Sequence, residues 1–139
     1  MTQEDKDLLL KDLCARLPYG VKFACNKNVY TAKGLDLIVT NEGDWEYAVT
    51  AKGITPIEID FIKPYLFPLS SMTEDQKNEY YSIVNYISSD DTENWKEGEF
   101  IYIDQFSCLI HFYHINHLDY RGLIPKGLAI DATGLNIYK

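Results

Sequence analysis

The chain has 139 residues, the size of one typical domain, and 46% of them are hydrophobic and 14% aromatic. This composition excludes a disordered chain and predicts a core that packs without a metal or a disulfide. Thirteen Lys and Arg against 21 Asp and Glu give a formal net charge of −8. Because a negative surface repels phosphates, this charge argues against direct binding of DNA or RNA.

Targeting signals and cysteine usage point to the same compartment. Residues 1–7 are strongly charged, and no apolar run approaches the roughly 20 residues that span a bilayer, so we expect neither secretion nor membrane insertion. Cys14, Cys25 and Cys108 are widely separated and form no CxxC pair. This spacing disfavours a disulfide framework and a thiolate zinc site. We therefore expect reduced thiols and a cytoplasmic protein.

An N-terminal helix is predicted over about 3–16. Thr2 stands three residues before Asp5, which is the spacing of a capping box, and acidic residues in the first turn suit the helix dipole. Pro18 and Gly20 then favour the end of the helix and a turn. The apolar face of this helix consists of Leu9, Leu10, Leu13 and Leu17.

The next part of the chain, about 20–62, changes to short β-rich runs separated by turn residues such as Lys52-Gly53. The close spacing favours antiparallel hairpins, and we expect a meander of about five strands. This meander forms a small antiparallel sheet or an SH3-like barrel, because curling hides the edge strands. The predicted strands are 21–25, 29–32, 35–40, 45–50 and 57–62.

The segment 63–68 contains two prolines and two aromatic residues, which suits a rigid joint between sheet and helix or an extended binding surface. A second helix then begins after Thr73, the N-cap, with Gln76 at the capping-box position. Its apolar residues recur at the spacing of one helical face, so it packs against another element. They are Tyr80, Ile83, Val84 and Ile87.

The last third of the chain is less regular. Residues 99–103 resemble a short strand, and 104–117 suits either a strand or a helix. We favour a helix with Asp104 as its cap. Extended segments are predicted near 128–130 and 135–138.

Taken together, the elements indicate an α+β fold in a single domain over 1–139. The N-terminal helix leads into the small sheet or barrel. Two further helices, with short strands, make up a helical part over about 73–139.

Three histidines are the most tempting metal ligands. His111, His114 and His117 recur at intervals of three, and imidazoles together with carboxylates bind transition metals. On one straight helix, at about 100° per residue, the three imidazoles fan over about 120° and do not close on one ion. We therefore expect no metal site, and His114, His117 and Asp119 are the candidates if one exists. His117 also suits a hydrogen-bonding position near a helix end.

No set of acid, base and nucleophile stands out in the sequence. Ser70-Ser71-Met-Thr73 lacks the glycines of a phosphate cradle or a nucleophile elbow. Cys108 precedes His111 by three residues, which leaves a thiol–imidazole dyad open, although the neighbouring residues are apolar. We therefore expect no catalytic residue and no cofactor.

Four residues are candidates for binding. Asp119-Tyr120-Arg121 places an acid, a phenol and a guanidinium together, which suits the binding of phosphate or carboxylate and equally a structural ion pair. With the aromatic residues of the earlier segment, the candidates are Tyr65, Phe67, Tyr120 and Arg121. The sequence leaves open whether they form a binding surface or structural joints.

Three blocks, Met1–Val21, Lys63–Glu74 and His117–Ala129, cover roughly a third of the chain. They include the motifs LCARLPYGV, KPYLFPLSSMT and HLDYRGLIPKGLA. In combination they resemble a family of small uncharacterised proteins of gut Bacteroidota genomes, their phages and mobile elements, in which a basic residue often stands at the position of Phe67. The resemblance implies a cytoplasmic setting associated with a phage or prophage, and it carries no activity.

These observations lead to one expectation and two alternatives. We expect a non-enzymatic protein that interacts with a protein partner, as an accessory of a phage or mobile element. The first alternative is a small metal-dependent or cysteine enzyme that uses Cys108, His111, His114 and His117. The second is an acidic mimic of nucleic acid.

Overall fold

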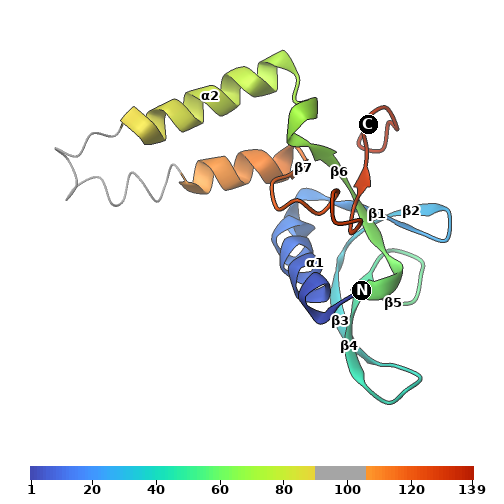
Figure 1. Ribbon diagram of the computed structural model, residues 1–139. Helices are drawn as coiled ribbons and strands as arrows, with labels where there is room; N and C mark the ends of the chain where they lie inside the picture. The colour runs from blue at the N-terminus through green and yellow to red at the C-terminus, as the bar shows by residue number, and fades with distance from the viewer. Residues whose placement is uncertain (90–105) are drawn as a thin grey trace.

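The first helix lies beside the strands, and the two later helices extend away from them (Figure 1). The computed structural model describes residues 1–89 and 106–139 of the chain. Two small sheets and α1 (Gln3–Arg16) form the body, and α2 (Glu74–Ser89) extends from it beside a helix over 106–115. The predicted α+β class, with an N-terminal helix and two later helices, is confirmed.

The first helix, α1, begins at the predicted capping box. The hydroxyl oxygen of Thr2 accepts from the backbone N–H of Asp5 at 3.1 Å, and the Asp5 carboxylate accepts from the N–H of Thr2 at 3.3 Å. The helix continues into a 3-10 turn, Leu17–Tyr19, after which Gly20 takes a φ of +71°. Glycine adopts this left-handed conformation at low cost, so the chain turns into the sheets where the sequence predicts.

The predicted five-strand meander divides between two sheets, and no barrel closes. One antiparallel sheet has the order β3-β4-β5, formed by Gly34–Val39, Trp45–Thr50 and Ile57–Glu58. The hairpin of β1 (Lys22–Cys25) and β2 (Asn28–Thr31) belongs to the other sheet. The SH3-like barrel is therefore wrong, and the small antiparallel sheet is the alternative that the structure bears out.

The strand β6 (Lys63–Pro68) occupies the segment that the sequence predicts as an irregular joint or surface. It pairs antiparallel with β1 and parallel with both β7 (Leu118–Asp119) and β8 (Ile130–Asp131). Pro64 and Pro68 lie near its two ends, where a missing N–H interrupts the ladder least. With β6 as the second neighbour of β1 and no partner for β2 in the β3-β4-β5 sheet, the first hairpin belongs to the β6 sheet alone.

The predicted strand over 57–62 is shorter in the structure. Only Ile57–Glu58 is extended, and Ile59–Phe61 forms a 3-10 turn. The turn buries Ile59 and leaves Phe61 67% exposed. The chain can then redirect from β5 into β6, which a continuous strand would not allow.

The C-terminal elements agree with the prediction in part. The ambiguous segment 104–117 is helical where it is described, over 106–115, so the helix interpretation is confirmed there. Residues 135–138, predicted as extended, form turns that begin with a hydrogen bond from the Leu135 N–H to the Ala132 carbonyl oxygen at 3.1 Å. The predicted strand over 99–103 lies outside the described residues.

The two later helices pack against each other. α2 starts at the predicted cap, because the Thr73 hydroxyl oxygen accepts from the Gln76 N–H at 3.2 Å and the Gln76 side chain accepts from the Thr73 N–H at 2.9 Å. The ring of Tyr80, on the predicted apolar face of α2, lies 6.2 Å from that of Phe112 and 6.4 Å from that of Tyr113, centroid to centroid. Aromatic contacts thus join the pair.

One hydrophobic core unites α1, both sheets and the turns near the C-terminus. Its fully buried members include Leu9, Leu13, Val21, Phe23, Val49, Leu66 and Leu123. Because these residues come from segments far apart in the sequence, neither the β-rich part nor the C-terminal turns bury their apolar side chains alone.

The position of β6 in this core is testable by truncating Leu66, which is 0% exposed. Leu66→Ala is expected to lower the free energy of unfolding by about 2–5 kcal/mol, because it leaves a cavity in a packed interior. Leu69→Ala, at a 39% exposed position, is the matched control and is expected to cost about 1 kcal/mol or less. Urea unfolding followed by circular dichroism measures both, and equal losses would contradict the buried position of β6.

Candidate functional site

The predicted residue Arg121 lies in a buried charged cluster with Asp12 and Arg16 of α1. Arg16 Nε donates to Asp12 Oδ2 at 2.7 Å, and Arg16 Nη2 donates to the carbonyl oxygen of Leu118 at 2.6 Å. Arg121 Nε lies 3.2 Å from Asp12 Oδ1. Burial raises the pKa of the fully buried Asp12 carboxyl, although both guanidiniums lower it. The charged cluster thus ties α1 to the C-terminal segment.

The ring of Tyr120 covers this charged cluster. The guanidinium carbons of Arg16 and Arg121 lie 5.3 and 5.0 Å from its centroid, close enough for a cation–π interaction. Tyr113 stacks on the same ring with centroids 4.8 Å apart. The Tyr120 hydroxyl is hydrogen-bonded to Nε2 of His114 at 2.8 Å. Contacts within the protein therefore hold Tyr120 and Arg121, the two predicted binding residues of this loop, in place.

Asp119 anchors the turn that follows it. Its two carboxylate oxygens accept from the backbone N–H groups of Leu123 at 2.9 Å and Ile124 at 2.8 Å. Asp119 is also almost fully buried, with 7% exposure. The carboxylate that the sequence offers as a metal ligand is thus occupied by backbone donors.

All three histidines contact tyrosines, and the Tyr19 ring lies beside both His111 and His114. His111 Nδ1 is hydrogen-bonded to the Tyr19 hydroxyl at 2.9 Å, whereas His114 Nε2 is hydrogen-bonded to Tyr120. The His117 ring stacks on Tyr138 at 3.6 Å between centroids. Within residues 1–89 and 106–139, no three His, Cys, Asp or Glu side chains lie close enough together to hold one metal ion. Cys108 is exposed, and His111 directs Nδ1 to Tyr19 rather than to the thiol.

Two of these imidazoles are neutral at pH 7. Burial lowers the pKa of His114 from 6.5 to about 4, and the nearby Arg16 and Arg121 lower it further. Burial also lowers the pKa of His117 to about 4, with Arg16 and Lys22 as lesser causes. A neutral ring suits hydrogen bonding and stacking in a partly apolar setting.

Tyr65 and Phe67 on β6 lie apart from the charged cluster, beside the C-terminal turns. The Tyr138 hydroxyl donates to the Tyr65 carbonyl oxygen at 2.6 Å, and the Phe67 N–H donates to the His117 carbonyl oxygen at 2.8 Å. Phe67, His117 and Tyr138 line a hollow of about 400 Å³. The four predicted binding residues thus divide into two sites with different neighbours.

Two of the three sequence blocks, Lys63–Glu74 and His117–Ala129, are here named the aromatic blocks, and they meet through their backbones. In the parallel pair of β6 and β7, Phe67 lies opposite Leu118 and Pro68 lies opposite Asp119. The first strand comes from the earlier block and the second from the later one. Both blocks therefore act as structural joints in this fold.

An exposed apolar surface lies elsewhere, on the β3–β4 hairpin. Leu37 pairs with Tyr47, and Val39 pairs with Trp45. Directly paired residues share one side of a sheet, so these four side chains form one surface, here named the apolar face. Their exposed fractions are 49% for Leu37, 54% for Val39, 67% for Trp45 and 47% for Tyr47.

The apolar face was not predicted from the sequence, although the pairing of its four residues can be derived from the sequence. The Thr40 N–H donates to the Asp44 carbonyl oxygen at 2.8 Å and closes the turn between the strands. Counting back from this turn places Val39 opposite Trp45 and Leu37 opposite Tyr47. The sequence does not show that the core covers this side only near Val49 and leaves the outer part of the hairpin exposed.

No family model matches the chain, and neither a curated protein nor a solved structure is similar to it. The function must therefore be inferred from the residues and their geometry. No helix in the described parts of the chain combines the length and the apolar character needed to cross a bilayer.

The charged cluster is testable through Asp12. Asp12→Asn leaves the buried Arg16 guanidinium without its carboxylate, so the free energy of unfolding is expected to fall by about 3–5 kcal/mol. Asp7→Asn, at an exposed position of the same helix, is the control and is expected to change it by about 0.5 kcal/mol or less. An Asp12 variant as stable as the Asp7 variant in urea would refute a structural role for the cluster.

The lowered pKa of His114 predicts how stability depends on pH. Between pH 6.5 and about 4 the unfolded chain binds a proton at His114 that the folded chain does not, so this contribution to stability falls as pH falls. His114→Gln keeps a hydrogen-bonding group without the titration. It is expected to reduce the loss of unfolding free energy from pH 7 to pH 4.5 by about 1–3 kcal/mol.

Urea unfolding curves at four pH values in this window measure the effect. Parallel pH profiles for the wild type and His114→Gln would show that folding does not lower the pKa of His114.

Proposed function

We propose that the chain is a non-enzymatic protein that binds another protein through the apolar face. The observation that carries this proposal is the apolar face itself: four large side chains on one side of a hairpin, each about half exposed or more. The hairpin extends from the body at the end remote from α2 (Figure 1), so a partner can reach it. Contiguous exposed apolar patches of this kind mark interaction sites.

The residue types of the apolar face favour a protein as the partner. Tryptophan and tyrosine are enriched among the residues that carry most of the energy of protein interfaces. Here Trp45 and Tyr47 are flanked by Val39 and Leu37, which can exclude water from the contact. An aromatic centre with an aliphatic border is the composition expected of an interface core.

The partner is expected to use side-chain contacts rather than to extend the sheet at β3. Since Thr40 pairs with Asp44 by backbone hydrogen bonds, the alternation of an antiparallel ladder directs the Leu37 N–H away from β4. The Asp36 carboxylate accepts from that N–H at 2.9 Å. A charged side chain on the outer edge opposes the addition of a further strand.

The cellular setting of the proposal rests on the resemblance of the three blocks. It makes the chain a cytoplasmic accessory protein of a phage or mobile element in gut Bacteroidota. The rival enzyme gains no specific support, because the side chains of His111, His114 and His117 are each engaged with tyrosines. The acidic mimic of nucleic acid gains none either.

The proposal is tested by the double variant Trp45→Ser/Tyr47→Ser. We expect it to remain folded, because both side chains project from the core, and to lose at least about tenfold in the recovery of specific partners. Tagged protein is used for affinity capture from an extract of a Bacteroidota host, with quantitative mass spectrometry. Sedimentation equilibrium of the purified protein shows whether a second copy is the partner.

The matched control is Tyr81→Ser/Leu135→Ser, which also removes two exposed apolar residues, 57% and 50% exposed, outside the hairpin. It is expected to recover the same partners as the wild type. If the two double variants recover equal amounts of every partner and leave self-association unchanged, the apolar face is not the docking surface.

A further inference from the structure

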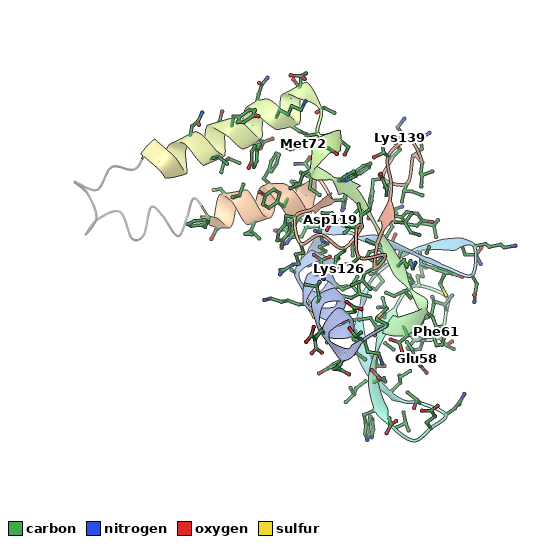
Figure 2. All side chains as sticks on the ribbon, in the orientation of Figure 1. Glu58, Phe61, Met72, Asp119, Lys126 and Lys139 are labelled. Atoms are coloured by element: carbon green, nitrogen blue, oxygen red, sulfur yellow. The ribbon has the colours of Figure 1, made fainter. Side chains whose placement is uncertain are left out.

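Two hollows adjoin on the other side of the β3–β4 hairpin. One has a volume of about 630 Å³ and the other about 320 Å³, and both are lined by Glu58 and Phe61. Figure 2 shows these two residues side by side near the hairpin. Ile38 lines the first hollow and Glu46 the second, and these paired residues alternate with the apolar face along their strands. The two hollows together are named the groove.

The larger end of the groove combines apolar side chains with the polar residues Asn26, Asn28 and Thr55. The apolar side chains at this end come from β2, β3, β5 and the segment before β5. They are Tyr30, Ile38, Ile54, Pro56 and Ile57. This lining offers burial to one apolar side chain of a ligand.

The smaller end of the groove is acidic. Five carboxylates line it, from the turn after β3, from β4, from β5 and from the 3-10 turn. They are Glu42, Asp44, Glu46, Glu58 and Asp60. One cation, Lys6 of α1, also lines it, so the negative charge at this end exceeds the positive charge.

Lys6 shows how the acidic end of the groove binds an ammonium group. Its Nζ lies 2.9 Å from Glu46 Oε1 and 3.1 Å from Asp60 Oδ2. Hydrogen bonds from these two carboxylates raise the pKa of Lys6. In the described parts of the chain, Glu42, Asp44 and Glu58 form no ion pair and are open to a cation from outside.

We propose that the groove binds a peptide segment of a partner protein that carries an apolar side chain next to Lys or Arg residues. The apolar side chain enters the larger end, and the cations lie among Glu42, Asp44 and Glu58. Phe61 stands at the shared wall and is 67% exposed, so a cation can also contact its ring. The acidic end repels phosphates, which favours a basic peptide over a nucleic acid or an anionic membrane.

The probe is a synthetic library of ten-residue peptides, each with one Leu, Phe or Trp and two Lys at varied spacing in a Gly-Ser background. Binding to the full chain is measured by fluorescence anisotropy. Against the best binder, Glu42→Gln/Asp44→Asn/Glu58→Gln is expected to weaken affinity about tenfold, because the three carboxylates that attract the two lysines are lost. Phe61→Ser is expected to weaken it by about fivefold.

The matched control is Glu74→Gln/Asp75→Asn/Glu79→Gln on α2, which changes the net charge by the same amount away from the groove. It is expected to leave the affinity within about twofold. Circular dichroism of each variant verifies the fold. A library with no binder, equal losses in the two triple variants, or equal binding of a peptide without its apolar residue would each overturn the proposal.

The groove is independent of the proposed function, because the apolar face lies on the other side of the hairpin. Trp45→Ser/Tyr47→Ser is therefore expected to keep the affinity for the selected peptide. A failure of the groove and a failure of the apolar face can then be told apart.

Discussion

The pairing of β6 with strands from both ends of the chain is the constraint on which the rest of the structure depends. This six-residue strand has β1 as its antiparallel neighbour and β7 and β8 as parallel neighbours. Backbone hydrogen bonds from one strand thus hold the N-terminal hairpin and the C-terminal turns together. Leu66, at its centre, is buried in the core that all these elements share.

The same pairing decides which surfaces remain free. The hairpin of β1 and β2 joins β6 rather than the β3-β4-β5 sheet, and that sheet is not closed into a barrel. The core covers the part of the sheet near Leu35 and Val49, which are paired across the strands. The outer part of the hairpin extends past the core and keeps its apolar side chains in solvent. The charged cluster and the histidine–tyrosine contacts, by contrast, join elements of the fold to each other.

The sequence predicts the elements that local chemistry determines. The capping boxes at Thr2 and Thr73 locate two helices because their partners are three residues away. The pairing of strands that are distant in the sequence could not be predicted from local patterns. Pro64 and Pro68 suggest an irregular segment, and only the pairing with β1, β7 and β8 makes that segment a strand. The tyrosines that the histidines contact include Tyr19 and Tyr138, which are distant in the sequence and could not be predicted from the spacing of the histidines.

The candidate site was less predictable than the fold, for a physical reason. Aromatic residues such as Phe67 and Tyr120 suit an interface and a core joint equally well, and burial alone separates the two roles. The exposure of Trp45 was not predicted, because a large apolar residue of a strand is normally covered by the core. Its exposure depends on where the other sheet lies, which no local pattern encodes.

The central claim is that the hairpin docks the partner while the aromatic blocks are structural. Its most direct test is photo-cross-linking in host cells, with p-benzoylphenylalanine in place of Trp45 or, in a second protein, of Phe67. The account predicts a discrete adduct with another protein from position 45 and none from position 67. An adduct from position 67 alone would contradict it.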